Sequence, residues 1–177
     1  MRKMPAKSIE RDKARQKEIL DACGRLYQIK GFHDITIKDI SEETSLSRPS
    51  IYNYFETKEE IFLGLLTREH AAWNKHLGML RDDFSSLTKE AFASKLADTL
   101  ADREVLLKIC AMNLYEIEEN SRPERLVDYK QAFKESLEIF CGCLRQFFPT
   151  THRMIEIRSG TLSFPFCMAF ILMLIQR

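Results

Sequence analysis

The sequence predicts an all-α chain, on three observations. Glycine and proline are scarce, six and five of 177 residues, and the remaining composition favours helix over a sheet of many strands. Apolar residues recur every three or four positions through most of the chain, which is the period of a helix with one buried face. Several of these stretches begin with a hydroxyl side chain followed three residues later by a carboxylate, as capped helices do.

A first helix is predicted over residues 10–30. The apolar positions that define its buried face are Ile19, Ala22, Cys23, Leu26 and Ile29. Gly31 follows as the C-terminal cap, and Phe32 is placed to pack behind it.

A second and a third helix, both short, are predicted over residues 37–44 and 48–54. Thr36 and Asp39 form a capping-box-like start for the second helix. Ser47 is the best N-cap for the third, and it leaves Pro49 in the first turn, where the missing N–H breaks no helical bond. The Ser47 hydroxyl is then expected to cap the N–H of Ser50.

The rest of the chain is predicted to be helical as well. Thr57 and Glu60 repeat the capping signature and begin a long fourth helix that reaches about residue 80. Further helices are expected over residues 88–100, 103–118 and 122–147. The last has the clearest apolar stripe, at Leu126, Tyr129, Phe133, Leu137, Phe140, Leu144 and Phe147. It opens with Ser121-Arg122-Pro123-Glu124, which repeats the serine-arginine-proline start seen at Ser47, so this start signal is itself structural.

Composition also indicates the compartment. The five cysteines are an odd set without a CxxC pair, typical of reduced cysteines in a cytosolic protein. Basic residues at the amino terminus are not followed by the apolar stretch of a signal peptide, so we expect a cytoplasmic location. The apolar run over residues 161–175 is broken by Pro165 and is shorter than the roughly 20 residues that cross a bilayer, so we expect no membrane span. A buried or subunit-interface helix fits this run better.

Charge is unevenly distributed. The chain has a net charge of +1, but residues 1–17 carry seven Lys or Arg side chains and only two acidic ones. A basic arm on a slightly acidic body is compatible with phosphate binding by one end of the protein. A solvated leader without any binding role explains the same charges.

The first helices also suggest a function. Two short helices joined by a tight turn, behind a longer helix, are typical of a helix-turn-helix, whose second helix enters the major groove of DNA. The same spacing fits a three-helix packing unit with no DNA role. Spacing alone leaves both interpretations open.

A family resemblance favours the first interpretation. The relevant run is EILDACGRLYQIKGFHDITIKDISEETSLSRPSIYNYFETKEEIFLGLL, about 50 of the 177 residues. Its matching positions are Ile19, Leu20, Ala22, Leu26, Tyr27, Gly31, Phe32, Thr36, Ile37, Ile40, Leu46, Ser47, Ile51, Tyr52, Tyr54, Phe55, Lys58, Glu59 and Leu65. This run resembles the amino-terminal domain of the tetracycline-repressor (TetR) family of bacterial regulators. It departs from the family pattern at Thr44-Ser45, where Ala-Gly is usual, and at Pro49, where Gly is frequent.

The resemblance implies a division into two domains. Residues 1–57 would form the helix-turn-helix DNA-binding domain with its basic arm, and residues 58–177 a helical regulatory and dimerisation domain. Family members commonly run longer, with two closing helices that build a four-helix dimer interface. The chain after about residue 160 is therefore expected to be truncated, altered, or a compact variant.

Ten residues are predicted to contact DNA. They are Thr36, Lys38, Ser47, Arg48, Pro49, Ser50, Tyr52, Asn53, Tyr54 and Lys58. The start of the recognition helix faces base edges, so Arg48 suits a guanine, the Pro49 ring suits a thymine methyl, and Ser50 suits a base or a phosphate. Tyr52, Tyr54 and Lys58 suit phosphates. The resemblance implies the same role for the start of the second helix, at Thr36 and Lys38.

Alternatives remain for several of these residues. Tyr52 is equally suited to packing inside the small domain, because aromatic residues on short helices are usually core. Lys38 fits a merely solvated lysine, and Asn53 fits a base or water. Arg48 has no obvious structural role, which makes it the strongest single candidate for DNA contact.

The second domain offers weaker signals. The resemblance implies that it dimerises and encloses a pocket for a small-molecule effector. Candidate pocket residues are Met112, Tyr115, Phe133, Phe140 and Met168, although such residues at helical spacing are more often core. The four histidines lack the spacing of metal ligands, so no metal is expected, and no cofactor.

The sequence therefore predicts a DNA-binding transcriptional regulator: a ligand-responsive repressor that binds a palindromic operator as a homodimer. It is not predicted to be an enzyme and has no candidate catalytic residue, because a glycine-rich phosphate loop, HExxH and GxSxG are all missing from the sequence. The alternative is a helical module that binds a ligand or a protein without specific DNA binding.

Overall fold

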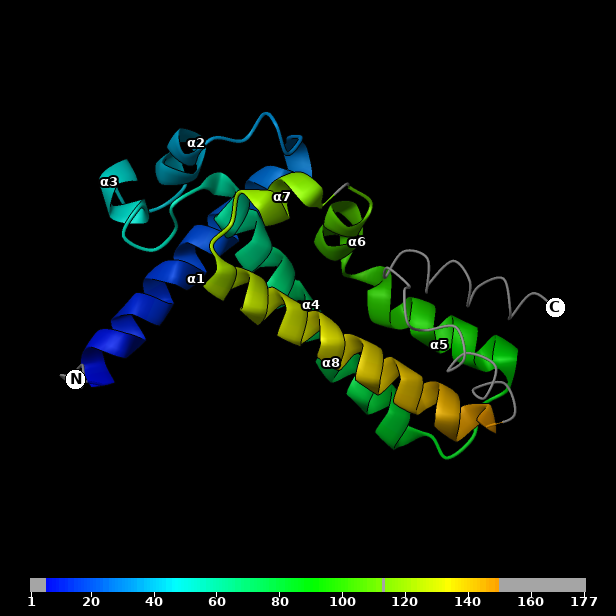
Figure 1. Cartoon of the computed structure of the whole chain (residues 1–177). Coiled ribbons are helices and arrows are strands. Elements are labelled where there is room, and N and C mark those ends of the chain that lie inside the picture. Colours follow the sequence, from blue (N-terminus) through cyan, green and yellow to red (C-terminus); the bar gives the residue numbers. More distant parts are fainter. Residues whose placement is uncertain (1–5, 113, 150–177) are drawn as a thin grey trace. The chain divides into compact units, whose positions relative to one another are not determined.

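The computed structural model describes residues 6–112 and 114–149, and every regular element within them is a helix (Figure 1). The prediction of an all-α chain is confirmed. The helices are α1 (Ala6–Ile29), α2 (Ile37–Glu42), α3 (Arg48–Ile51), α4 (Lys58–Asp83), α5 (Lys89–Ala101), α6 (Glu104–Cys110), α7 (Tyr115–Glu119) and α8 (Pro123–Phe147). No helix in the described residues is both long and apolar enough to cross a membrane. The apolar run after residue 161 lies outside the described part.

One predicted helix was wrong. The stretch 103–118 is not continuous, because α6 ends at Cys110 and α7 begins only at Tyr115. At this end the N–H of Ala111 still bonds to Leu107 O, but the N–H of Met112 bonds to Ile109 O, one residue closer. This change from i→i−4 to i→i−3 bonding tightens the last turn and ends the helix.

The end of α1 also differs from expectation. Gly31 does follow the helix, but no described residue has a positive φ, so Gly31 does not form a left-handed cap. The chain leaves α1 through the bonds Lys30 N–H to Leu26 O at 2.9 Å and Asp34 N–H to Gly31 O at 3.2 Å. Phe32 packs behind the helix as predicted, 4% exposed.

The chain divides into two compact units. The described residues of the first are 6–66 and 115–127, and those of the second are 67–112, 114 and 128–149. The first unit therefore contains the predicted DNA-binding helices together with α7 and the first turn of α8.

The core of the first unit forms where α1, α3 and α4 meet. Tyr27 and Phe32 both make edge-to-face contacts with Phe62, with ring centroids 5.0 Å and 4.8 Å apart. A Cβ atom added at Gly64 would lie 3.2 Å from a Leu20 methyl and 3.3 Å from the Phe55 ring, so glycine permits this close packing. Ile19, Ile40, Ile51 and Ile61 complete the core and are fully buried.

The second unit is built from the later parts of α4 and α8 with α5 and α6. The two long helices run in the same direction here, because His70 meets Ser136 and Leu77 meets Cys143. Phe92 of α5 covers α8 with its ring centroid 6.3 Å from that of Phe140. The apolar stripe predicted for α8 is buried at Tyr129, Phe140, Leu144 and Phe147.

Candidate nucleic-acid interface

The helix-turn-helix begins at Thr36, the N-cap of α2. Its hydroxyl accepts a bond from the N–H of Asp39, and the Asp39 carboxylate accepts one from the Thr36 N–H at 2.8 Å, so the predicted capping box is present. Asp39 also binds Lys30, the residue that follows α1, at 2.8 Å. Hydrogen bonds from Lys30 and then from Thr36 hold the pKa of Asp39 far below its usual value. The start of α2 is thereby fixed to the carboxyl end of α1.

The turn between α2 and α3 is held from α1. Ser45 stands where the family usually has glycine, yet the turn contains no positive φ. The N–H of Ser45 donates to Glu18 at 2.6 Å, and Arg15 donates to the Ser45 hydroxyl at 2.6 Å. The first of these bonds is the main reason why the pKa of Glu18 lies below its usual value. Two side chains of α1 therefore stabilise a turn that lacks the family's glycine.

Ser47 is the N-cap of α3 and Pro49 lies in the first turn, as predicted, but the expected side-chain cap is not formed. The N–H of Ser50 bonds to the carbonyl of Ser47 at 2.9 Å instead, so it is no longer available to the hydroxyl. The Ser47 hydroxyl pairs with the Ser50 hydroxyl at 2.9 Å. Ile51 and Phe55 are buried and attach α3 to the core.

A hollow of about 360 Å³ lies beside α3, between the starts of α2 and α4. Its lining includes Thr36 and Lys38 at the start of α2, Arg48 and Tyr52 of residues 48–54, here called the recognition segment, and Lys58 of α4. Half of the residues predicted to contact DNA thus surround one concave surface. Two acidic residues, Glu56 and Glu59, line it as well.

The positively charged side chains that line this hollow differ in their contacts with the rest of the chain. The Arg48 side chain is exposed and makes no ion pair or hydrogen bond with any residue that the structure describes. Lys38 is exposed and lies 3.8 Å from Glu42, an i,i+4 pair on one helix. Lys58 donates to Phe32 O at 3.1 Å and lies over the Phe32 ring at 4.4 Å, so it also braces the loop after α1.

The other predicted contacts lie outside the hollow. Ser47, Pro49 and Asn53 are exposed and Ser50 is half-buried. Tyr54 is also half-buried, and its hydroxyl lies 3.4 Å from Asp12 of α1, so this side chain has an intramolecular partner. Tyr52 is 48% exposed, so it is not a core residue.

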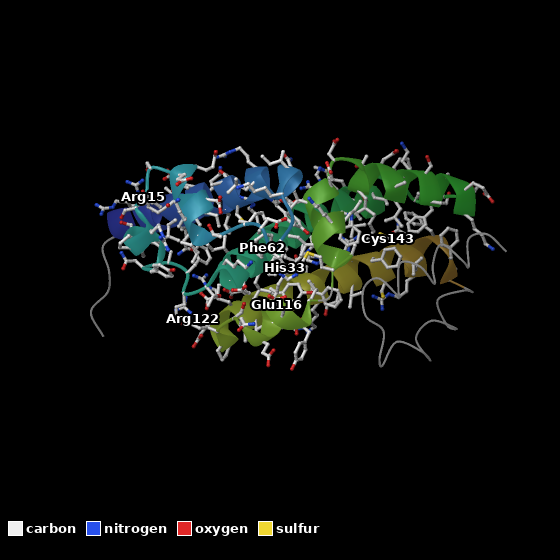
Figure 2. All side chains as sticks on the ribbon, turned by 90° about the horizontal axis from the view of Figure 1, so that it is seen from above. Arg15, His33, Phe62, Glu116, Arg122 and Cys143 are labelled. Atoms are coloured by element: carbon white, nitrogen blue, oxygen red, sulfur yellow. The ribbon has the colours of Figure 1, made fainter. Side chains whose placement is uncertain are left out.

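Sequence reasoning missed the residues that hold the end of the recognition segment. Arg122 and Arg125, from the start of α8, both direct guanidinium groups at the carbonyl of Tyr54. Helix α7, just before α8, adds a contact to the same unit. Its Glu116 lies beside His33, 4.0 Å away, as Figure 2 shows. The repeated serine-arginine-proline motif was the available signal. Its second copy begins the helix at Pro123, and the Ser121 hydroxyl bonds back to Ile117 O at 2.7 Å.

The candidate effector residues are distributed over both units. Phe133 and Phe140 belong to the second unit, where Phe133 lies edge-on to His70 at 5.6 Å and Phe140 is 5% exposed. Tyr115 belongs to the first unit and is 67% exposed. Met112 is half-buried just after α6. Met168 lies outside the described residues, and within them no group of three potential metal ligands occurs.

Comparison with known proteins matches most of the chain. A family model described as "Bacterial regulatory proteins, tetR family" matches residues 19–65, and one described as "Tetracyclin repressor-like, C-terminal domain" matches residues 67–154. The first includes every residue of the predicted DNA surface. The second includes α7 and the start of α8, although these pack in the first compact unit.

Several relatives are helix-turn-helix regulators. The chain is 35% identical over 60 residues to the HTH-type transcriptional regulator YdgC of Bacillus subtilis, covering 34% of this chain and 31% of that relative. It is 29% identical over 161 residues to an HTH-type transcriptional regulator in the lacX 3′ region of Lactococcus lactis, covering 83% and 81%. The regulator RutR of Escherichia coli is 31% identical over 85 residues, covering 47% and 40%. The chain thus spans about a third of the YdgC regulator's length and most of the Lactococcus regulator's.

Proposed function

Because the chain belongs to the tetR family of bacterial regulatory proteins and is a DNA-binding transcriptional regulator, we propose that it is a cytoplasmic, ligand-responsive repressor that binds a palindromic operator as a homodimer. One observation carries the proposal. Arg48 is the first residue of α3, is exposed, and makes no side-chain hydrogen bond or ion pair with the residues that the structure describes; it lines a concave surface together with Lys38, Tyr52 and Lys58.

The geometry divides the contacts into two kinds. The first turn of α3 enters the major groove, where the Arg48 guanidinium can form two hydrogen bonds to a guanine edge. Thr36, Lys38, Tyr52 and Lys58 contact the phosphates on either side and set the register. In a homodimer the two copies of α3 read half-sites about one helical turn apart.

Regulation is assigned to the chain after residue 66. We place dimerisation and effector binding there, with the effector changing the separation of the two recognition helices by a coupling of about 1 to 3 kcal/mol. The match of residues 67–154 to the tetracycline-repressor-like C-terminal model supports this assignment.

Selection from a library of random duplexes would test the proposal. The protein is expected to enrich a two-fold symmetric sequence, bound by two chains, with affinity that falls steeply as salt rises. Arg48→Ala should lower discrimination between the selected and a scrambled duplex by about 1 to 3 kcal/mol. Lys58→Ala should weaken both alike and reduce the salt slope by about one.

Lys75→Ala supplies the matched control, because Lys75 is an exposed lysine of the same helix in the second unit. It should leave both affinities unchanged. Equal losses from Arg48→Ala and Lys58→Ala would overturn the division into base and phosphate contacts. Enrichment of no sequence, or binding insensitive to salt, would favour a helical module without specific DNA binding.

A further inference from the structure

The carbonyl of Tyr54, at the end of the recognition segment, receives two arginines from a distant part of the chain. Arg125 donates to this oxygen at 2.8 Å, and Arg122 approaches it at 3.5 Å. The Arg125 guanidinium also lies over the Phe55 ring, 4.9 Å from its centroid. Tyr54 lies three residues beyond the end of α3 at Ile51, so these charged donors bind the backbone just after the recognition helix.

Arg122 is itself firmly placed. Its Nε and Nη2 atoms bind the two oxygens of Glu60 at 2.6 Å and 2.8 Å, and its backbone N–H adds a third bond to Glu60 at 3.0 Å. The Glu60 side chain is fully buried. Thr57 adds a bond from its hydroxyl to Asn120 O at 2.9 Å. The start of α8 is thus fastened to the first turn of α4, immediately after α3.

The recognition helix needs such support because it is very short. α3 spans only four residues, and a helix of this length is not stable by its own backbone bonds. Ile51 and Phe55 attach it to the core along one face. Burial of two side chains on one face leaves the helix free to tilt about that line. The hydrogen bond from Arg125 to Tyr54 O, three residues beyond its carboxyl end, opposes this motion.

We propose that Arg122 and Arg125 are positioning residues for DNA recognition, which hold the end of α3 so that Arg48 meets the groove in one orientation. The inference rests on the proposed DNA contact of α3, and it adds two residues outside the match of 19–65 to those on which recognition depends. Both arginines act through the recognition helix and make no base contact themselves.

Arg125→Met tests the proposal with little risk to the fold, because methionine keeps an apolar stem against Phe55 while the Glu60–Arg122 pair remains intact. Arg103→Met is the matched control: Arg103 is a partly buried arginine of the second unit, 3.3 Å from Glu69. The probes are the duplex selected with the full chain and a scrambled duplex of equal length, with the active fraction of each variant measured by titration.

Arg125→Met should weaken binding of the selected duplex by roughly tenfold, the value of a charge-assisted hydrogen bond. Binding of the scrambled duplex and the salt slope should not change, because no phosphate contact is lost. Arg103→Met should alter neither affinity. A slope reduced by about one would show that Arg125 binds phosphate directly and would overturn the proposal. The proposal would also be overturned if Arg125→Met discriminated between the selected and the scrambled duplex as well as the wild type does.

Amide hydrogen exchange without DNA separates this inference from the proposed function. Arg125→Met should lower the protection of the Tyr54 and Phe55 amides, which bond to Ile51 O, and leave the amides of α5 unchanged. Unchanged protection at Tyr54 and Phe55 would overturn the positioning role. If the wild-type chain does not discriminate between the duplexes, the proposed function fails, while the exchange comparison still decides whether the arginines hold α3.

Discussion

Helix α4 carries two fully buried polar side chains, one in each compact unit, and they are satisfied in opposite ways. Glu60, in the first unit, is charged and lies in a fork of the Arg122 guanidinium. His70, in the second unit, shares a hydrogen bond between its Nδ1 atom and the Ser136 hydroxyl at 3.0 Å. The buried side chain of the first unit is thus bound by a charged partner, and that of the second by a neutral hydroxyl.

The protonation states follow from the surroundings. Burial alone would raise the pKa of Glu60, but hydrogen bonds from Arg122 and from the Glu56 N–H outweigh it and place the pKa below its usual value. Burial lowers the pKa of His70 to about 4, because the loss of water disfavours the charged imidazolium. The rings of Tyr129 and Phe133 lie 6.0 Å and 5.6 Å from the imidazole.

The neutral cluster has a defined proton arrangement. The Ser136 hydroxyl donates to Asn74 Oδ1 at 2.5 Å and also lies 3.1 Å from Ala132 O, so its oxygen is left to accept from His70 Nδ1. Asn74 in turn donates to Ala132 O at 3.2 Å. The same amide group also donates to the exposed Glu135 carboxylate at 3.1 Å, whereas the bonds among His70, Ser136, Asn74 and Ala132 join uncharged groups. The comparison therefore predicts that the two units respond differently to the loss of one partner and to acid.

Removing the arginine should have the largest effect. Arg122→Met leaves the Glu60 carboxylate buried without its counter-ion and should lower the free energy of unfolding by about 3 to 5 kcal/mol. Urea unfolding followed by circular dichroism measures this loss. The double variant Glu60→Gln, Arg122→Met should recover much of it, because no charge is then buried and the amide oxygen can still accept the Glu56 N–H. A loss below about 1 kcal/mol would place the pair with ordinary surface ion pairs.

Acid should weaken the second unit before the first. Between pH 6.5 and about 4 the His70 imidazole takes up a proton in the unfolded chain and stays neutral in the folded one, so the free energy of unfolding falls as pH falls. The loss should approach about 3 kcal/mol. Glu60, whose pKa is lowered from 4.5, contributes stability above that value and loses it only at lower pH.

His70→Phe isolates this effect. Unfolding in urea at pH 7.5 and at pH 5 should show a smaller difference for the variant than for the wild type, whatever its absolute stability. An unchanged difference between the two pH values would assign the titration to other groups and remove the contrast between the units.

Much of the first unit could be predicted from local sequence. The capping box at Thr36, the proline in the first turn of α3 and the burial of Ile51 and Phe55 each depend on residues within a few positions of one another. The exposure of Arg48 follows from the same spacing. Local patterns are sufficient here because caps and helix faces are set by neighbours in the chain.

The parts that were missed depend on distant or ambiguous signals. Arg122 lies 62 residues from Glu60 along the chain. The capping signature of Thr57 and Glu60 already explained why a glutamate stands there, so no distant partner was expected. The bond from the Glu60 N–H to the Thr57 hydroxyl is present, but the carboxylate turns to Arg122. The break after Cys110 escaped because the buried positions on either side, Ile109 and Ile117, keep the period of one continuous helix.

The smallest of the three effects should come from Ser136→Ala. This change removes one neutral hydroxyl and leaves His70 Nδ1 and Asn74 Oδ1 each short of one hydrogen bond, which should cost about 2 kcal/mol of unfolding free energy. Ser94→Ala, an exposed serine of α5 in the same unit, should change stability by no more than about 0.5 kcal/mol. Both are measured by urea unfolding at pH 7.5. Because a neutral group can reorient toward another partner, whereas the Glu60 carboxylate without Arg122 must either stay charged while buried or take up a proton at a cost in free energy, Ser136→Ala should cost less than Arg122→Met. Equal losses would show that burial, and not charge, determines the strength of both clusters.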